Sequence, residues 1–124
     1  MAGLRVDEVV AEPLQRGEPR ARAAEAARLR ARLLPRAWRV ALDPEGSVPE
    51  SSPAFAAWLE RRMRDRPVAF VVGGAVGIDA ELMSECEESL SLGTLTMPHQ
   101  LARVVLAEQL YRALCISSGH PYPH

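Results

Sequence analysis

The segment Val68-Ala-Phe-Val-Val-Gly-Gly-Ala-Val-Gly77 decides the fold class of this chain. Its first half is a continuous apolar run rich in β-branched side chains, which predicts a central strand covered on both faces. The glycines follow without a spacer, and Asp79 can cap a helix that runs from Ala80 to about Leu90. A strand that leads through a glycine turn into a helix is typical of α/β proteins with a parallel sheet.

The rest of the chain repeats this alternation. Runs of strand character alternate with segments whose apolar residues recur at helical spacing, and prolines mark several helix boundaries. We expect strands at 4–10, 38–42, 68–72 and 94–97, and helices at 20–34, from Ser51 or Ser52 to Asp65, at 80–90 and at 100–116. Four strand-then-helix units predict a largely parallel sheet with helices on both faces. Ligands of such sheets gather beyond the carboxyl ends of the strands, so the candidate site comprises the loops 43–46, 73–77 and 97–99.

Length and composition indicate one domain, residues 1–124. The chain is 48% hydrophobic and 25% charged, which suffices for a core without a metal or a disulfide framework. Cys86 and Cys115 are isolated in the sequence, so we expect buried free thiols and no metal site.

No apolar run approaches the ~20 residues of a membrane span. The first ten residues carry charges where a signal peptide would be apolar. We therefore expect a cytoplasmic protein.

Charge is unevenly distributed along the chain. Residues 1–66 hold 13 Arg against 10 acidic residues, whereas residues 67–124 hold 2 Arg against 6, and there is no Lys. Arginine forks match the geometry of phosphates. The net charge of −1 nevertheless argues against strong nonspecific binding of nucleic acid by a single chain.

The residues alone do not identify the chemistry. The glycines at 73, 74 and 77 lack the spacing of a dinucleotide fingerprint and the Lys of a phosphate-binding loop, so a tight turn without a ligand stays open. Glu108 and Arg112 have the spacing of a surface ion pair. Arg103 is nine residues before Arg112, so the two arginines lie on opposite sides of a straight helix. Composition and spacing therefore lead to a small α/β ligand-binding protein.

Four segments of the C-terminal part are more specific in combination. They are 68–77, Leu95-Thr-Met-Pro-His99, Arg103-Val-Val-Leu-Ala-Glu-Gln-Leu-Tyr-Arg112 and His120-Pro-Tyr122. In order and spacing they closely resemble the RlmH family, whose members are SPOUT-class methyltransferases of ribosomal RNA. The resemblance is strong over 68–122, whereas from 4 to 46 only the pattern of elements corresponds. It implies a SPOUT-type α/β fold with a mostly parallel sheet and a C-terminal trefoil knot.

The resemblance also implies an activity and a cofactor. The activity is methyl transfer from S-adenosylmethionine to N3 of a pseudouridine in the large-subunit ribosomal RNA, on the assembled ribosome. It is performed by a homodimer whose active site uses both chains. By matching position, the cofactor would be held by Leu42, Gly74, Gly93, Thr94, Leu95, Thr96, Met97 and Pro98.

Polar residues of the C-terminal quarter receive roles by the same resemblance. An arginine would stabilise the anion that develops on the base, and a carboxylate or an imidazole would receive the proton. The catalytic candidates are Arg112, Glu108, His120 and Arg103, and the substrate-binding candidates are His99 and Tyr122.

Two features depart from the family pattern. The chain begins at what would be the second strand of the family, so we expect the first strand-helix unit to be absent. Pro123 and His124 end the chain where the family has a His and a basic residue. An alternative interpretation is a catalytically degenerate homologue that binds S-adenosylmethionine or the ribosome without methyl transfer. An unrelated small α/β nucleotide-binding module is the third.

The helix at 100–116 is apolar around more than one face. Val104, Val105, Leu106, Leu110 and Leu114 are too widely spread for a single buried stripe. We therefore predict that part of this helix packs against a second chain.

Overall fold

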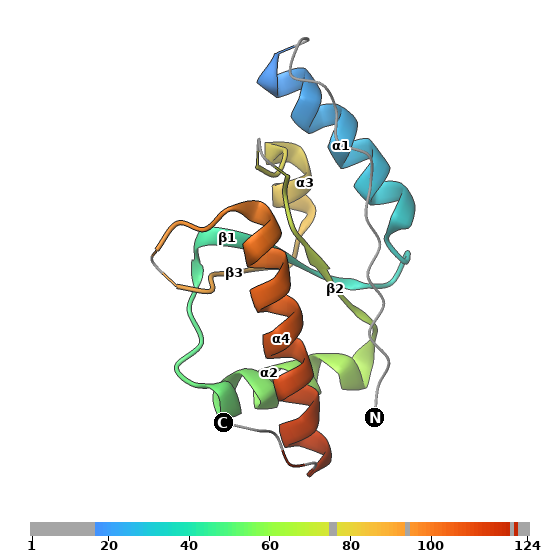
Figure 1. Ribbon diagram of the computed structural model, residues 1–124. Coiled ribbons are helices and arrows are strands. Elements are labelled where there is room, and N and C mark those ends of the chain that lie inside the picture. The colour runs from blue at the N-terminus through green and yellow to red at the C-terminus, as the bar shows by residue number, and fades with distance from the viewer. Residues whose placement is uncertain (1–16, 75–76, 94, 120, 122–124) are drawn as a thin grey trace.

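The computed structural model describes residues 17–74, 77–93, 95–119 and 121 (Figure 1). Its elements are α1 (Glu18–Arg32), β1 (Trp38–Ser47), α2 (Ser52–Asp65), β2 (Val68–Val71), α3 (Ala80–Glu85), β3 (Glu88–Leu90) and α4 (His99–Ser118). The described strands form one parallel sheet in the order β2-β1-β3. The α/β class and the parallel sheet are confirmed, and the expected strand at 4–10 lies outside the described residues.

Among the described strands, β1 lies in the centre of the sheet. It pairs with β2 from Trp38 opposite Val68 onward and with β3 from Val40 opposite Glu88 onward. Val40 and Ala41 are completely buried because both faces of β1 are covered. The expectation that 68–72 is covered on both faces is confirmed, because its apolar residues pack against helices on both sides. Among the described strands β2 lies at an edge, and its expected central position stays a prediction.

The core lies in two layers, one on each face of the sheet. On one face, Val40 and Leu90 pack against α2 and α4, which supply Phe55, Ala56, Leu59, Leu106, Leu110 and Ala113. On the other face, Val71 packs against Ala26 of α1 and Leu82 of α3. Figure 1 shows the corresponding arrangement, with α4 crossing α2 and with α1 beside α3. Helices on both faces of the sheet were predicted correctly.

Three of the expected helices form close to their predicted bounds. Helix α1 ends two residues early, and α4 extends one residue before and two beyond the expected 100–116. Helix α2 begins as expected, because the Ser51 hydroxyl accepts a hydrogen bond from the Ala54 N–H at 3.1 Å and Pro53 occupies the first turn.

The expectations for 80–97 were partly wrong. Helix α3 ends at Glu85 rather than near Leu90, and β3 follows directly. The described residues 95–97 form no strand, and the side chain of Leu95 is 82% exposed. After Glu85, hydrogen bonding to β1 outweighs the helical pattern of the sequence. The Glu87 N–H donates to the Arg39 carbonyl at 2.9 Å and so attaches this segment to β1.

The expected loop at 43–46 is part of β1. The register between β1 and β3 breaks between Leu42 and Ser47, so the intervening residues bulge out of the ladder. Gly46 permits this close passage, because a Cβ atom there would lie 2.8 Å from the Leu90 amide nitrogen. The bulge brings Asp43 to the carboxyl end of the sheet.

Candidate functional site

One cavity of about 540 Å³ lies at the carboxyl ends of the three strands. Its volume is within the range of small-molecule sites. The lining residues come from the end of β1, the glycine turn after β2, α3, and the segment between β3 and the first turn of α4. Each of the three loops expected to form the site contributes to it. Of the cofactor candidates, the cavity is lined by Leu42, Gly74, Gly93, Leu95, Met97 and Pro98.

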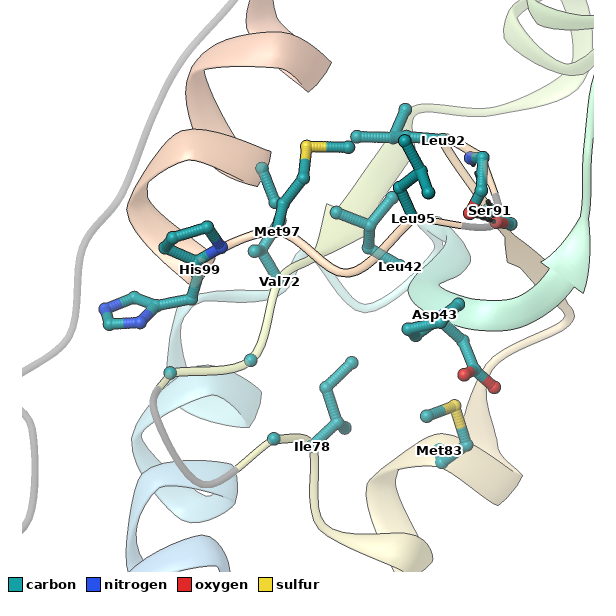
Figure 2. Close-up of a pocket in the computed structure, with 17 residues that line it drawn as sticks. Leu42, Asp43, Val72, Ile78, Met83, Ser91, Leu92, Leu95, Met97 and His99 are labelled. Carbon is teal, nitrogen blue, oxygen red and sulfur yellow. Dashed lines mark hydrogen bonds between the residues drawn. The ribbon is translucent and has the colours of Figure 1, made fainter.

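Apolar side chains form most of the cavity walls. Figure 2 shows Leu92, Leu95 and Met97 gathered above Leu42, while Ile78 and Met83 form the opposite wall. The Leu42 side chain is half-buried, whereas Leu95 is largely exposed, so the slot is partly open to water. Such a slot suits the flat face of a heterocycle.

The charge of the lining is distinctive. Among the described lining residues Asp43 carries the one carboxylate, and none is Arg or Lys. Asp43 Oδ1 accepts a hydrogen bond from the Glu45 N–H at 3.1 Å, which fixes the carboxylate at the rim. The described part of the cavity therefore offers no Arg or Lys side chain for a phosphate group. It is better matched to a neutral or positively charged nucleoside.

The glycine turn forms one side of the cavity with backbone atoms. The Gly77 N–H donates to the Gly74 carbonyl at 3.0 Å, and this closes the turn. A Cβ atom at Gly73 would lie 2.6 Å from the Gly77 carbonyl carbon, so no side chain fits inside the turn. Gly77 has a φ of 82°, a conformation that glycine adopts without strain. These features explain why glycines occur here and leave the backbone accessible to a ligand.

Ser91 is a lining residue that sequence reasoning missed. It is 1% exposed, its hydroxyl donates to the Gly93 carbonyl at 2.8 Å, and it accepts from the Gly93 N–H at 3.1 Å. Its own N–H bonds to the Ser47 carbonyl at 2.9 Å, so the turn is tied to β1. The sequence signal was a Ser two residues before a Gly, a frequent local turn that is too common to be specific.

The candidates from Thr94 to His99 and at the end of the chain differ in their relation to this cavity. His99 and Pro98 line it, and Figure 2 shows the His99 ring pointing away from Leu42. Thr96 is exposed and is not one of the described lining residues. Thr94, His120 and Tyr122 lie outside the described residues.

The candidates on α4 form a separate group. The Arg112 Nη2 atom is 2.8 Å from Glu108 Oε1, which is the expected ion pair at i, i+4. Glu108 and Arg112 follow His99 by 9 and 13 residues along α4, which corresponds to roughly 14 and 20 Å at the helical rise. Arg103 is half-buried in the second turn, and it is not a described lining residue. The structure therefore does not bring Glu108 and Arg112 into the cavity of their own chain.

The cysteines are not arranged for chemistry. Cys115 is buried as expected, and Cys86 is half-buried. Burial raises the pKa of the Cys86 thiol, which makes it less nucleophilic at neutral pH. Within the part of the chain that the structure describes, no group of His, Cys, Asp or Glu is placed to bind a metal ion. No described helix is both long and apolar enough to cross a membrane.

Comparison with known proteins places this cavity in context. A family model described as "Predicted SPOUT methyltransferase" matches residues 1–124. The chain is 50% identical over 117 residues to a ribosomal RNA large subunit methyltransferase H of Acidiphilium cryptum, covering 93% of this chain and 73% of that protein. The protein of that name from Bordetella pertussis is 45% identical over 122 residues, with coverage of 96% and 78%.

A third relative shares the highest identity of these three over a shorter span. The ribosomal RNA large subunit methyltransferase H of Gluconacetobacter diazotrophicus is 54% identical over 88 residues, covering 70% of this chain and 57% of that protein. The matches extend well beyond the motifs around the cavity, and the observed α/β architecture agrees with them. The chain belongs to the SPOUT methyltransferase family and has its fold.

Proposed function

We propose that this chain is an S-adenosylmethionine-dependent methyltransferase that acts on N3 of a pseudouridine in the ribosomal RNA of the large subunit. One cavity carries this proposal, because turns that are distant in sequence line a single space of nucleoside size. They contribute Leu42, Gly74, Gly93, Leu95, Met97 and Pro98. Relatives that are named ribosomal RNA large subunit methyltransferase H support ribosomal RNA as the substrate class. Such a substrate implies action in the cytoplasm.

The lining residues fit S-adenosylmethionine. Leu42, Leu95 and Met97 offer apolar contact to adenine, and the glycine turn offers backbone groups without side-chain bulk. The carboxylate of Asp43 complements a cationic sulfonium or ammonium group, and the lack of Arg and Lys among the described lining residues removes repulsion. These residues would hold the cofactor, which supplies an electrophilic methyl group.

The residues of this chain then have two tasks, to align the target nitrogen and to manage its proton. The N3–H of the base is weakly acidic, and its proton must leave as the new N–C bond forms. In our proposal the Arg112 guanidinium, held by Glu108 at 2.8 Å, stabilises the negative charge that develops on the base. Arg103 is the other candidate for stabilising this charge. Glu108, His120 or His99 receives the proton, and Tyr122 contacts the substrate.

A second copy of the chain would complete the site. Glu108 and Arg112 lie too far along α4 to reach the cavity of their own chain, at roughly 14 and 20 Å from His99. Exposed apolar residues on the same helix, Leu101, Val104 and Tyr111, are at least half exposed. Their exposure supports the predicted packing of α4 against a partner chain. The homodimer would thus supply α4 of one subunit to the cavity of the other.

Calorimetry with S-adenosylhomocysteine and mass spectrometry of ribosomal RNA test the proposal. We expect the chain to bind S-adenosylhomocysteine and to restore N3-methylpseudouridine to ribosomes from a deletion strain. Arg112→Ala should bind S-adenosylhomocysteine as the wild type does and lose at least about 100-fold in methyl transfer, the size expected for a charge-stabilising donor. Binding without any methylation by the wild type would favour the catalytically degenerate homologue, and absence of binding would contradict the cofactor assignment.

A further inference from the structure

Glu25 is a buried carboxylate that the proposed mechanism does not use. It is 9% exposed, and among the described residues it shares the class of buried polar side chains with Ser91 alone. Burying a carboxylate is costly unless the surrounding groups compensate for it. Ser91 is explained by the turn that it fixes at Gly93, whereas Glu25 lies on α1 and is not one of the described residues that line the cavity.

The position of Glu25 is set by the packing of α1. Ala21 and Glu25 are both buried and lie one turn apart, so they share the inner face of the helix. The next residue, Ala26, packs with Val71 at the end of β2 and with Leu82. This packing brings the Glu25 side chain to the glycine turn that follows β2.

The carboxylate lies directly against Gly74. A Cβ atom on Gly74 would lie 3.0 Å from Glu25 Oε1 and 3.8 Å from its Cδ. Gly74 also lines the cavity, so the backbone at this point separates the carboxylate from the candidate cofactor site. Glu25 itself takes part in interactions in the structure. A negative charge in this position is attracted to the backbone N–H dipoles that a glycine turn presents.

We propose that Glu25 is a positioning residue that holds the glycine turn from outside the cavity and so preforms the wall on which the cofactor binds. It acts through Gly74 and does not touch the cofactor. The same contact gives a second reason for glycine at position 74, because any side chain there would displace the carboxylate. This inference rests on the proposed function for the identity of the ligand, but the link between Glu25 and the turn is testable without a ligand.

Glu25→Gln removes the charge and keeps the shape of the side chain. In the ligand-free protein, we expect amide hydrogen exchange in the segment 73–78 to accelerate about tenfold, because the turn loses the attraction of the buried charge that lies against Gly74. Exchange in α4 should stay unchanged. The dissociation constant of S-adenosylhomocysteine and the KM for S-adenosylmethionine should rise by a similar factor, with kcat at saturation preserved. Glu60→Gln, an exposed carboxylate on α2, is the matched control and should alter none of these.

Unchanged exchange at 73–78 in Glu25→Gln would overturn the proposal. A uniform acceleration over the whole chain would also overturn it, because that would indicate general destabilisation and no specific hold on the turn. If the wild type does not bind S-adenosylhomocysteine, the proposed function fails, while hydrogen exchange still decides the role of Glu25.

A double-mutant cycle tests the contact itself. Gly74→Ala should accelerate exchange at 73–78 because its methyl group meets the carboxylate. Glu25→Asp shortens the side chain by one methylene and makes room for that methyl group. The double variant should therefore lose less protection than the two single variants predict together. Additive effects would show that the two residues act independently and would overturn the proposal.

Discussion

At the scale of single residues, Ser91 shows how one buried hydroxyl organises a binding loop. Its two hydrogen bonds to Gly93 and its backbone bond to Ser47 join the segment after β3 to the bulge in β1. Gly93 has a φ of 143°. A buried hydroxyl that both donates and accepts is well suited to fix such a turn.

Replacing Ser91 by Ala should therefore weaken both the fold and the site. We expect a loss of about 1 kcal/mol in the free energy of unfolding, because the Gly93 N–H and carbonyl lose their buried partner. Urea denaturation measures this loss, and calorimetry should show weaker binding of S-adenosylhomocysteine. Ser84→Ala, which removes an exposed hydroxyl bond to the Glu81 carbonyl, is the control and should leave binding unchanged.

Glu88 is a second single residue that connects several elements of the fold. Its carboxylate accepts hydrogen bonds from Trp38 Nε1 at 2.6 Å, Trp58 Nε1 at 3.2 Å and Arg62 Nε at 2.9 Å. Partial burial alone would raise the pKa of Glu88, but the bonds from Arg62 and the two indoles outweigh it and lower the pKa. The ionised carboxylate therefore holds β1, α2 and β3 together.

The lowered pKa predicts a pH dependence of stability. Because the folded state favours the ionised form, the contribution is fully present above the ordinary pKa of about 4.3 and is lost as the pH falls through the lowered value. At pH 7, Glu88→Gln should be less stable than the wild type by about 2 kcal/mol. Below the folded pKa, the two proteins should converge in urea denaturation. A difference that does not change with pH would contradict this account.

At the scale of elements, the close passage of β1 and β3 depends on Gly46. A methyl group there would lie 2.8 Å from both the Leu90 amide nitrogen and the Ser89 carbonyl carbon, which are backbone atoms that cannot turn away. Gly46→Ala should cost about 1–3 kcal/mol of stability by overpacking, as urea denaturation can measure. Ser47→Ala, an exposed change in the same strand, should cost far less. Equal stability of the two variants would show that the bulge relaxes freely.

The elements also show what can be predicted from sequence. Helices α2 and α4 have strong local signals, such as the Ser51 cap and the apolar spacing of α4, and both were predicted closely. Strand β3 was missed because Glu88 is fixed by Trp38, Trp58 and Arg62, whose contacts span 26 to 50 residues. The position of β1 between β2 and β3 likewise depends on which strands neighbour it. Hydrophobic runs do not encode that order.

The position of the cavity was predicted better than the strands. A strand-then-helix pattern already sends the loops after parallel strands to one edge, so the convergence of the loops 43–46, 73–77 and 97–99 followed from topology even though a strand was misplaced. Glu25 and Ser91 were not predicted. Each matters because it is buried beside a glycine, and the sequence does not reveal this burial, whether the glycine is distant or nearby in the chain. The trefoil knot and the roles of Thr94, His120 and Tyr122 stay predictions.

At the scale of the whole molecule, the distance between the cavity and the Glu108–Arg112 ion pair of the same chain bears on how two chains would share an active site. If the cavity of one subunit works with Arg112 of the other, two differently damaged chains can repair each other. Ala102→Trp would fill the cavity from the first turn of α4, and Arg112→Ala would remove the guanidinium. A mixed dimer then contains one site with an intact cavity and an intact arginine, and one site that lacks both.

Coexpression of these two inactive variants should therefore restore about a quarter of wild-type methyl transfer, because half of the dimers are mixed and half of their sites are intact. Val104→Glu, introduced into both chains at the exposed apolar face of α4, should abolish this recovery and yield monomers in light scattering. Arg64→Glu on α2 is the surface control and should preserve both. No recovery from well-formed mixed dimers would mean that each chain uses its own Arg112. The helix would then have to bend or shift to bring that side chain to the cavity.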